Sequence, residues 1–387
     1  MTEQDEQGAW TNAMTSLARA GDRFAAEMAA LGNPVDSADV YATMLGALSD
    51  TYLNQIAVTA DCPSFVPCTG YFQRLGSPNP DTVYRRAPID PAGTYRLTGY
   101  RGTALDVTLM PFSQMMQSFV PFDLSDVADG EDGRLDMIVS AERPAEYEGN
   151  WLQLDPRWAS LWLREVSEAW GEDEPARLAI MRMDSGSRTR PSAEATAAQL
   201  AGLAIRVERI VEYGIRHASE LAAQGYVNRL KTVDYGASGG MPLQWYHEGI
   251  FEIGLDDCLL VEAQMPADLP YFSWSLTDRT LVTLDWANAH TSLNRRQAVI
   301  HEDGVLRVVL SHGDPGTPNW LQTAGYRSGV LQCRTVGSKA PPEIGAKVVP
   351  MRSVQDYLPK PSRQITADQR LEVLRRRQIG QQMRRLW

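Results

Sequence analysis

Residues 132–165, DGRLDMIVSAERPAEYEGNWLQLDPRWASLWLRE, share a pattern with residues 303–335, DGVLRVVLSHGDPGTPNWLQTAGYRSGVLQCRT. Both stretches contain, in the same order, Asp-Gly, an alternating strand ending in Ser, a polar turn, Asn-Trp-Leu-Gln, another turn and a second alternating strand. Asp-Gly supplies the positive φ of a tight turn, and alternation buries one face of a strand. The shared order therefore predicts one β folding unit used twice.

The matched positions of the repeat have expected roles. Because Trp151 and Trp320 match between the copies, we expect each indole to anchor its own unit rather than stack on a ligand. Asn150 and Asn319 should then have similar backbone surroundings. A duplicated unit implies a seam between two halves, and such seams are common ligand sites. The residues expected on the buried strand faces are Leu135, Met137, Val139, Leu306, Val308 and Leu310.

Helical spacing brackets the two β units. Apolar residues recur at three- and four-residue steps in 8–31 and 37–56, and again in 192–224, where Ser192 is a plausible N-cap. We expect an α+β, mainly β fold: two related β-sandwich or jelly-roll-like modules with N-terminal, central and C-terminal helices. The expected segments are a helical hairpin (1–60), a first β module (61–190), a helical connector (191–235), a second β module (236–340) and a C-terminal extension (341–387). The extension should end in a basic helix whose inward residues are Leu371, Leu374, Ile379 and Met383.

The composition restricts the partners. The chain has 387 residues and a formal net charge of −11, which argues against nucleic acid or an anionic membrane as the main partner. We expect a small-molecule ligand and a homo-oligomer. Four scattered cysteines read as reduced thiols. The N-terminus has no signal-peptide pattern and the chain has no membrane-length apolar run, so a cytoplasmic location is expected.

Two groups of motifs resemble a known family. Residues 240–336, with YHEG, NAHTSLNRR and HGDPGTPNWL, resemble the domain of unknown function numbered 1214. Residues 76–103, GSPNPDTVYRRAPIDPAGTYRLTGYRGT, are similar to the signature of the associated domain numbered 1254. The resemblance implies a β-sandwich or jelly-roll-like architecture with attached helices, in bacterial proteins without an agreed reaction. Many relatives carry an export signal. Because no such signal is expected in this chain, the location of those relatives is not expected to apply to it.

The segment SPNPDTVY, residues 77–84, is the first candidate for ligand binding. Two prolines restrict its backbone, and that rigidity can present Asn79 and Asp81, with Tyr84 following, to a ligand. The competing interpretation is that Asn79 and Asp81 only cap the start of a strand through side-chain to backbone bonds.

Histidines supply the second set of candidates. His247 stands beside Glu248, and imidazole titrates near neutral pH, so His247 is a candidate general acid or base. The alternative is a histidine bonded into the module interface. His312 and Asp314 lie in the turn of the second copy, where the first copy has no imidazole, and His290 and Asn294 lie in a polar run expected at a cleft or loop.

No cofactor is expected. The P-loop and Rossmann glycine patterns are absent, and the histidines and carboxylates lack tight metal-ligand spacing, so a metal is the less favoured interpretation. Apolar walls of a cleft are expected from Tyr271, Trp274 and Trp286.

The leading hypothesis is an enzyme, a lyase, hydrolase or isomerase, that transfers protons on a neutral hydroxylated or carbonyl-bearing compound. His247 or His312 would be the acid or base, Asp81 or Asp314 the orienting group, and Asn79 and Asn294 hydrogen-bonding groups. The alternative is a non-catalytic ligand-binding or oligomeric assembly protein, whose seam would be filled by side chains.

Overall fold

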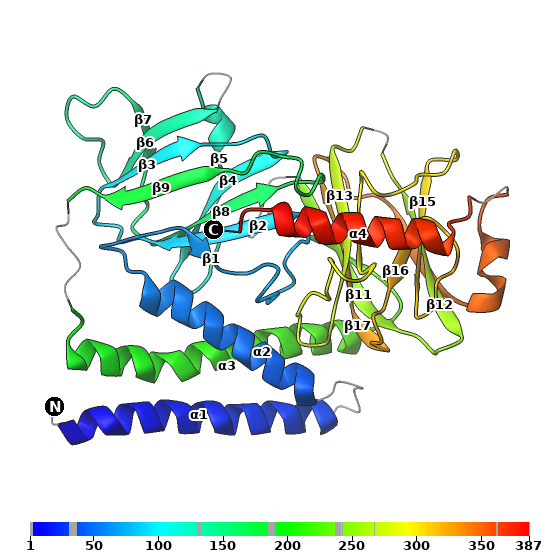
Figure 1. The fold of residues 1–387 in the computed structure, drawn as a ribbon, viewed down its shortest axis with the longest axis horizontal. Helices are drawn as coiled ribbons and strands as arrows, with labels where there is room; N and C mark the ends of the chain where they lie inside the picture. The colour runs from blue at the N-terminus through cyan, green and yellow to red at the C-terminus, as the bar shows by residue number, and fades with distance from the viewer. Residues whose placement is uncertain are drawn as a thin grey trace.

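Two β modules lie side by side in the computed structural model, with helices along them (Figure 1). The structure describes residues 3–30, 37–129, 133–184, 190–236, 241, 243–266, 268–360 and 363–386. Asp132, which begins the first repeat, lies outside these residues. Gly133 and Gly304 of the two Asp-Gly pairs both have a positive φ, 64° and 78°, as a tight turn requires.

The first module consists of two sheets. The five-stranded sheet has the order β1-β2-β8-β4-β5, and the four-stranded sheet the order β7-β6-β3-β9. The strands of the first sheet are β1 (Val66–Pro67), β2 (Thr82–Pro88), β8 (Trp158–Val166), β4 (Asp106–Ser113) and β5 (Phe122–Asp123). Those of the second sheet are β7 (Asn150–Gln153), β6 (Arg134–Ser140), β3 (Tyr95–Tyr100) and β9 (Arg177–Arg182).

The second module repeats this arrangement. Its sheets have the orders β10-β11-β17-β13-β14 and β16-β15-β12-β18. The strands of the five-stranded sheet are β10 (Lys231–Asp234), β11 (Gln244–Glu252), β17 (Ser328–Val336), β13 (Tyr271–Thr277) and β14 (Ser292–Asn294). Those of the four-stranded sheet are β16 (Trp320–Gln322), β15 (Val305–Ser311), β12 (Asp257–Gln264) and β18 (Ile344–Pro350). The sheets of this module thus include two strands that lie just outside the range 236–340 expected from the sequence, β10 before it and β18 after it.

The repeat seen in the sequence is a repeat in three dimensions. In both modules an otherwise antiparallel sheet ends in a parallel pair, β6 with β7 and β15 with β16. Trp151 Nε1 donates to Ser140 Oγ at 3.0 Å, and Trp320 Nε1 donates to Ser311 Oγ at 3.0 Å. Each indole therefore anchors its own module, as expected.

The two asparagines of the repeat have the similar surroundings that the duplication predicts. Asn150 Nδ2 lies 3.4 Å from the carbonyl oxygens of Val127 and Asp136. Asn319 Nδ2 lies 2.7 Å from that of Val299 and 3.0 Å from that of Arg307. Asn150 thus links β6 to the segment before β6, and Asn319 links β15 to the segment before β15. The prediction of two related modules is confirmed.

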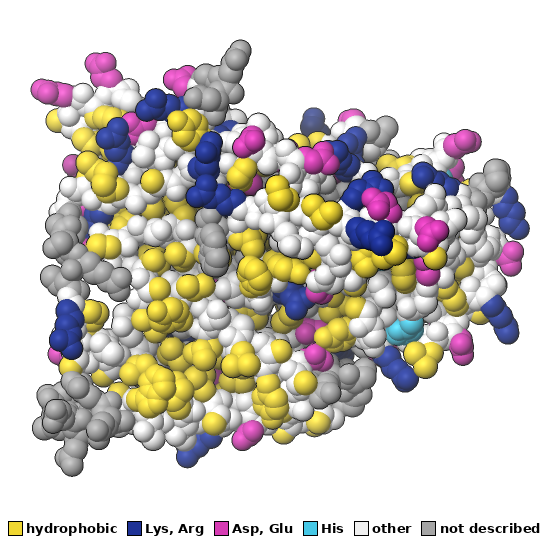
Figure 2. All heavy atoms as spheres, in the orientation of Figure 1, with side chains coloured by type: hydrophobic (Ala, Val, Ile, Leu, Met, Phe, Trp, Pro, Cys, Tyr) yellow, Lys and Arg dark blue, Asp and Glu magenta, His cyan; other side chains and the backbone are white. Residues whose placement is uncertain are grey.

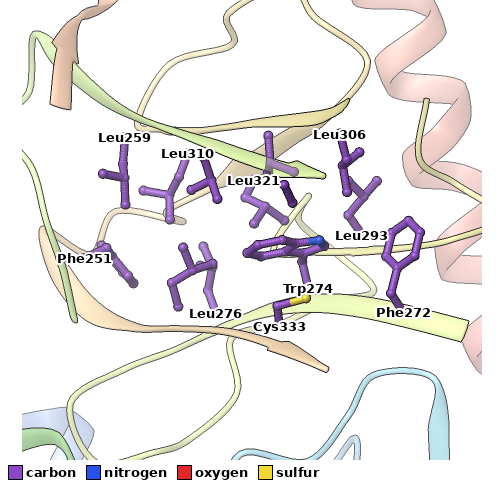
Figure 3. Close-up of a cluster of buried hydrophobic side chains, with 14 of the residues drawn as sticks. Phe251, Leu259, Phe272, Trp274, Leu276, Leu293, Leu306, Leu310, Leu321 and Cys333 are labelled. Atoms are coloured by element: carbon purple, nitrogen blue, oxygen red, sulfur yellow. The ribbon is translucent and has the colours of Figure 1, made fainter. Parts of the chain in front are cut away.

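Each module closes over its own apolar core. The core of the second module takes side chains from both of its sheets, among them Phe251, Leu276, Leu306, Leu310 and Trp274, which is fully buried (Figure 3). The expected inward strand residues Leu135, Met137, Val139, Leu306, Val308 and Leu310 are all buried. Burying a large apolar side chain contributes about 1.5–3 kcal/mol, so these two cores are the main source of stability for each module.

Three helices lie along one side of the modules (Figure 1). They are α1 (Glu3–Ala30), α2 (Ser37–Tyr52), which continues into the π-helical turn η1 (Leu53–Ala57), and α3 (Ala193–Ala223). Ser192 caps α3 by accepting from Ala195 N, as predicted. Short 3-10 turns, η2 (Leu124–Asp126) and η4 (Met351–Tyr357), complete the connections. Among the described residues, no helix combines the length and the apolar character needed to cross a lipid bilayer.

The C-terminal helix α4 (Ala367–Met383) docks by its polar face, so the predicted orientation was wrong. Leu371, Ile379 and Met383 are exposed, whereas Arg370 and Arg377 are buried. Arg377 donates to the carbonyl oxygens of Trp286 and Ser292. A guanidinium supplies the hydrogen-bond donors that these oxygens need, and an alkyl side chain does not. Hydrogen bonding to backbone carbonyls of the second module, and not apolar burial, therefore decides which face of α4 turns inward.

Candidate functional site

The SPNPD segment lies between the two modules, just before β2. Asp81 is 2% exposed and accepts three hydrogen bonds. Its Oδ1 accepts from Trp170 Nε1 at 2.9 Å and from Asn294 Nδ2 at 2.8 Å, and its Oδ2 accepts from the Tyr271 hydroxyl at 2.7 Å. Trp170 follows β8 of the first module, while Tyr271 and Asn294 belong to β13 and β14 of the second. One carboxylate thus joins both modules.

Asn79 completes this cluster from the same segment. Its Nδ2 donates to the Tyr271 hydroxyl oxygen at 2.6 Å, and its Oδ1 accepts from Ser273 Oγ at 3.1 Å. Asn79 Oδ1 also accepts from the backbone N–H of Asp81 at 3.2 Å, the local cap that the competing interpretation described. Tyr271 therefore connects Asn79 to Asp81. Asn79 both caps the local backbone and takes part in the contact between the modules.

Burial dominates the electrostatics of the cluster. It raises the pKa of Asp81, against the lowering effect of the bonds from Asn294, Tyr271 and Trp170, and it raises the pKa of Tyr271 well above its ordinary value. Burial, together with the nearby Asp81 carboxylate, raises the pKa of Glu168 to about 7. Glu168 Oε1 is buried and has no hydrogen-bond partner among the described residues. Glu168 is thus a titratable group near neutral pH that the sequence motifs did not reveal.

A second buried chain of polar groups starts at Ser77. Arg334, on β17, donates to the carbonyl oxygen of Ser77 and, at 3.2 Å, to its Oγ. Ser77 Oγ donates to Gln332 Oε1 at 2.6 Å, and Gln332 Nε2 donates to Glu248 Oε2 at 3.1 Å. Ser77 has a φ of 58°, a left-handed conformation that directs its carbonyl towards Arg334. The Ser77 turn and β17 are therefore joined through buried side chains.

His247 and Glu248 are neighbours in β11 and so point to opposite faces of the sheet. Glu248 accepts from Tyr235 at 3.1 Å and lies 3.1 Å from His217 Nε2, a histidine that no motif singled out. His247 Nδ1 lies 3.0 Å from Thr232 Oγ1, and burial lowers the pKa of His247 to about 4. The structure does not bring His247 and Glu248 together as an acid–base pair.

The remaining histidine candidates lie in the turns and edges of the second module. His312 Nδ1 lies 2.8 Å from Thr323 Oγ1, and Asp314 pairs with Arg370 of α4 at 2.9 Å. His290 packs on the Trp320 ring at 5.4 Å, and burial, helped by Arg377 and Arg370, lowers the pKa of His290 to about 4. No hydrogen bond in the described part of the chain joins His312, Asp314 or His290 directly to Asp81. Within the described residues, no group of three or more His, Cys, Asp or Glu side chains could hold a metal ion.

A small pocket, here called the junction pocket, lies beside the Asp81 cluster. Its volume is about 20 Å³, room for about one water molecule. Aromatic side chains contribute to its walls, and two of its lining residues carry polar atoms, Thr82 Oγ1 and Arg384 Nη2, that are buried without a hydrogen-bond partner among the described residues. The aromatic wall residues are Tyr71, Phe72, Tyr84 and Trp286.

The structure therefore brings six of the sequence candidates to one region, including Tyr271, which was expected as an apolar wall and instead bonds through its hydroxyl to Asn79 and Asp81. Asn79, Asp81 and Asn294 form the cluster, and Tyr84 and Trp286 line the adjoining pocket, whereas Trp274 lies in the core of the second module. Sequence reasoning missed Trp170, Glu168 and Arg384. Only proximity in the fold identifies them, because each is distant in sequence from the SPNPD segment.

Comparisons with known proteins give a family and a fold. Residues 87–165 match the family described as "Protein of unknown function (DUF1214)". The match falls on the first module and not on residues 240–336, where the motifs place the resemblance. The comparison with curated proteins found no match.

Solved structures also match this chain. An uncharacterized protein from Burkholderia cenocepacia superimposes with a TM-score of 0.81 at 24% identity, over 89% of this chain and 97% of that one. A protein from Vibrio parahaemolyticus gives a TM-score of 0.46 at 13% identity, over 79% of this chain and 98% of that one. The first comparison shows a shared fold. Residues 87–165 of this chain are a domain of the DUF1214 family.

Proposed function

We propose that this chain binds a neutral, hydroxylated or carbonyl-bearing small molecule in the junction pocket. The observation that carries the proposal is that the residues lining one pocket combine aromatic side chains with Thr82 and Arg384, whose Oγ1 and Nη2 are buried and unpaired among the described residues. Buried polar atoms are almost always hydrogen-bonded, so these two atoms call for a partner. Mostly apolar walls with a few fixed polar groups are typical of small-molecule sites.

The charges around the pocket favour a neutral ligand. Burial lowers the pKa of Arg384, and the nearby carboxylates of Asp81 and Glu165 act against that lowering. The remaining N–H of Arg384 can donate to a carbonyl or hydroxyl oxygen without needing a further anion. The Thr82 hydroxyl can donate or accept beside it.

A ligand larger than water has to displace part of the pocket wall. Tyr71 and Phe72 belong to the loop before the SPNPD segment, and Phe72 is 70% exposed. Gly70 and Gly76 flank this part of the loop with positive φ values of 144° and 69°. Movement of the Tyr71–Phe72 side chains is the step that would enlarge the pocket.

Thermal shift against neutral sugars, steroids and aromatic ketones tests the proposal, because a ligand of the folded state raises the melting temperature. At least one compound should stabilise the wild-type chain, with a smaller shift for Arg384→Met. Arg375→Met, an exposed arginine on α4, is the matched control and should respond like the wild type. Equal shifts in the Arg384→Met variant and the control, or no shift with any compound, would refute binding at this pocket.

A second candidate function is proton-transfer catalysis, favoured by Glu168. Its pKa of about 7 suits a general acid or base, and its unpaired Oε1 can exchange a proton. In this version of the enzyme hypothesis the carboxyl of Glu168 takes the role first considered for His247 or His312. Mass spectrometry of stabilising compounds after incubation with the chain should show a product, and Glu168→Gln should abolish it.

We also propose a homo-oligomer. Figure 2 shows hydrophobic side chains gathered over the region of α1 and α2, and Trp10, Tyr41, Leu45 and Tyr52 of these helices are exposed. Exposed apolar patches on a protein surface commonly mark contact sites. Light scattering after gel filtration should give a multiple of 42.9 kDa for the wild type and a smaller mass for Leu45→Glu. A wild-type mass of one chain would contradict this proposal.

A further inference from the structure

Arg164 and Arg334 occupy the same position in the two modules. On β8, Arg164 lies between Tyr84 of β2 and Thr108 of β4. On β17, Arg334 lies between Tyr246 of β11 and Ser273 of β13. Each guanidinium also lies over the ring of its tyrosine, at 5.9 Å from Tyr84 and 5.2 Å from Tyr246. The duplication therefore produced two equivalent arginine sites on the sheet faces that point away from the cores.

The protein itself fills the site of Arg334. The carbonyl oxygen and Oγ of Ser77 accept from Arg334 Nη2, and Ser275 Oγ accepts from Nη1 at 3.2 Å. The oxygen atoms of Ser77 come from the segment between the modules. A buried guanidinium requires such acceptors, because leaving its N–H groups unpaired away from water is costly.

The site of Arg164 is not filled in this way. Arg164 is only 8% exposed, yet the described residues give it no hydrogen bond, and its Nη1 is buried without a partner. Thr108 Oγ1 and Trp162 Nε1 are also buried without partners. Thr108 is the cross-strand neighbour of Arg164, and Trp162 lies two residues before Arg164 on the same face. Three potential donors thus lie on the same face of two neighbouring strands in one sheet.

We propose that Arg164 binds the carboxylate of a small organic acid, with Thr108 and Trp162 as further donors. A guanidinium presents a planar fork that matches the two oxygens of a carboxylate, and a hydroxyl and an indole N–H add to it. The ligand oxygens would take the place that the oxygens of Ser77 take at Arg334. This anion site is separate from the junction pocket and does not depend on the neutral ligand proposed there.

The surroundings of the anion site select a monoanion with an apolar body. Asp106 is close enough to interact with Arg164, and its presence disfavours a ligand with two negative charges, such as a phosphate dianion. The ring of Phe112 packs on that of Trp162 with centroids 4.6 Å apart, and Met110 lies opposite Trp162 on β4. These side chains give an aromatic or aliphatic acid an apolar surface to cover.

Calorimetric titration of the full chain with sodium benzoate tests the proposal, with benzamide as the neutral analogue and inorganic phosphate as the dianion. Benzoate should bind the wild type and Arg375→Met equally, and Arg164→Met about tenfold or more weakly, because a charge-assisted hydrogen-bonding pair is lost. Benzamide and phosphate should show no binding. Thr108→Val, which keeps the side-chain shape, should weaken benzoate binding less than Arg164→Met does, which provides a second measure if Arg164→Met folds poorly.

Three results would overturn the anion site. The first is equal benzoate affinity for the wild type and the well-folded Arg164 and Thr108 variants. The second is that the wild type binds benzamide as tightly as benzoate. The third is that the wild type binds none of benzoate, phenylacetate and hexanoate. Arg384→Met separates this site from the junction pocket. It should leave benzoate binding unchanged while reducing the response to the neutral compound, so either site can fail alone.

Discussion

Tyr271 donates its hydroxyl hydrogen to Asp81 Oδ2 at 2.7 Å, and this bond connects β13 of the second module to the segment that leads into the first. Both side chains are nearly inaccessible to water, 4% and 2% exposed. A buried carboxylate without its donors is costly, so the contact between modules depends on how completely this one carboxylate is satisfied.

Tyr271→Phe should destabilise the chain by about 3 kcal/mol, because it leaves both Asp81 Oδ2 and Asn79 Nδ2 without their shared partner. The free energy of unfolding, measured by urea denaturation, gives the effect. Tyr357→Phe is the control, since Tyr357 is 42% exposed and its ring lies under the Lys347 ammonium group. Adding Asp81→Asn should make the two effects clearly non-additive. Additive effects would show that the hydroxyl and carboxylate are energetically independent.

The titration of Glu168 should make stability depend on pH. The pKa of Glu168 is raised from 4.5 to about 7, so between these values the folded chain holds a proton that the unfolded chain has released. This contribution to stability is fully present below pH 4.5 and is lost as the pH rises through about 7. The melting temperature of the wild type should therefore fall over this range more steeply than that of Glu168→Gln. The control Glu302→Gln, at an exposed site, should follow the wild type, and identical curves for all three would contradict the assignment.

The repeated Ser–Trp bond allows one interaction to be compared in two settings. Ser311→Ala removes the acceptor of Trp320 Nε1 inside a buried site, whereas Ser140→Ala does so beside the half-buried Trp151, where water can replace it. We expect a loss of about 2 kcal/mol for Ser311→Ala and about 1 kcal/mol for Ser140→Ala. Urea denaturation of both variants gives the comparison, and a larger loss for Ser140→Ala would contradict it.

The sequence predicted the duplication because repeated spacing survives in local patterns such as Asp-Gly and Asn-Trp-Leu-Gln. It also identified Asn79 and Asp81, since two prolines fix their segment locally. It did not reveal Trp170 or Arg384, whose relation to Asp81 depends on how two modules and a C-terminal helix pack. His247 and Glu248 show the same limit. They are adjacent in sequence and so suggest a pair, but both belong to β11, where successive side chains point to opposite faces of the sheet.

The buried arginine face of α4 gives the last prediction. Arg377 donates to the carbonyl oxygens of Trp286 and Ser292, and its guanidinium lies 5.0 Å from the centre of the Trp170 ring. Arg377→Met keeps much of the side-chain length but removes every donor, so the carbonyls lose their partners, at a cost of about 2 kcal/mol or more.

Because the contacts of Arg377 hold α4 rather than the module cores, we expect the loss to appear first as release of this helix. Limited trypsin digestion should cleave within α4 of the Arg377→Met variant faster than in the wild type, before the modules are cut. Arg375→Met removes one exposed trypsin site on the same helix and should leave cleavage at the other sites as slow as in the wild type. If both variants resisted trypsin equally, the apolar residues of α4, and not its buried arginines, would have to hold the helix.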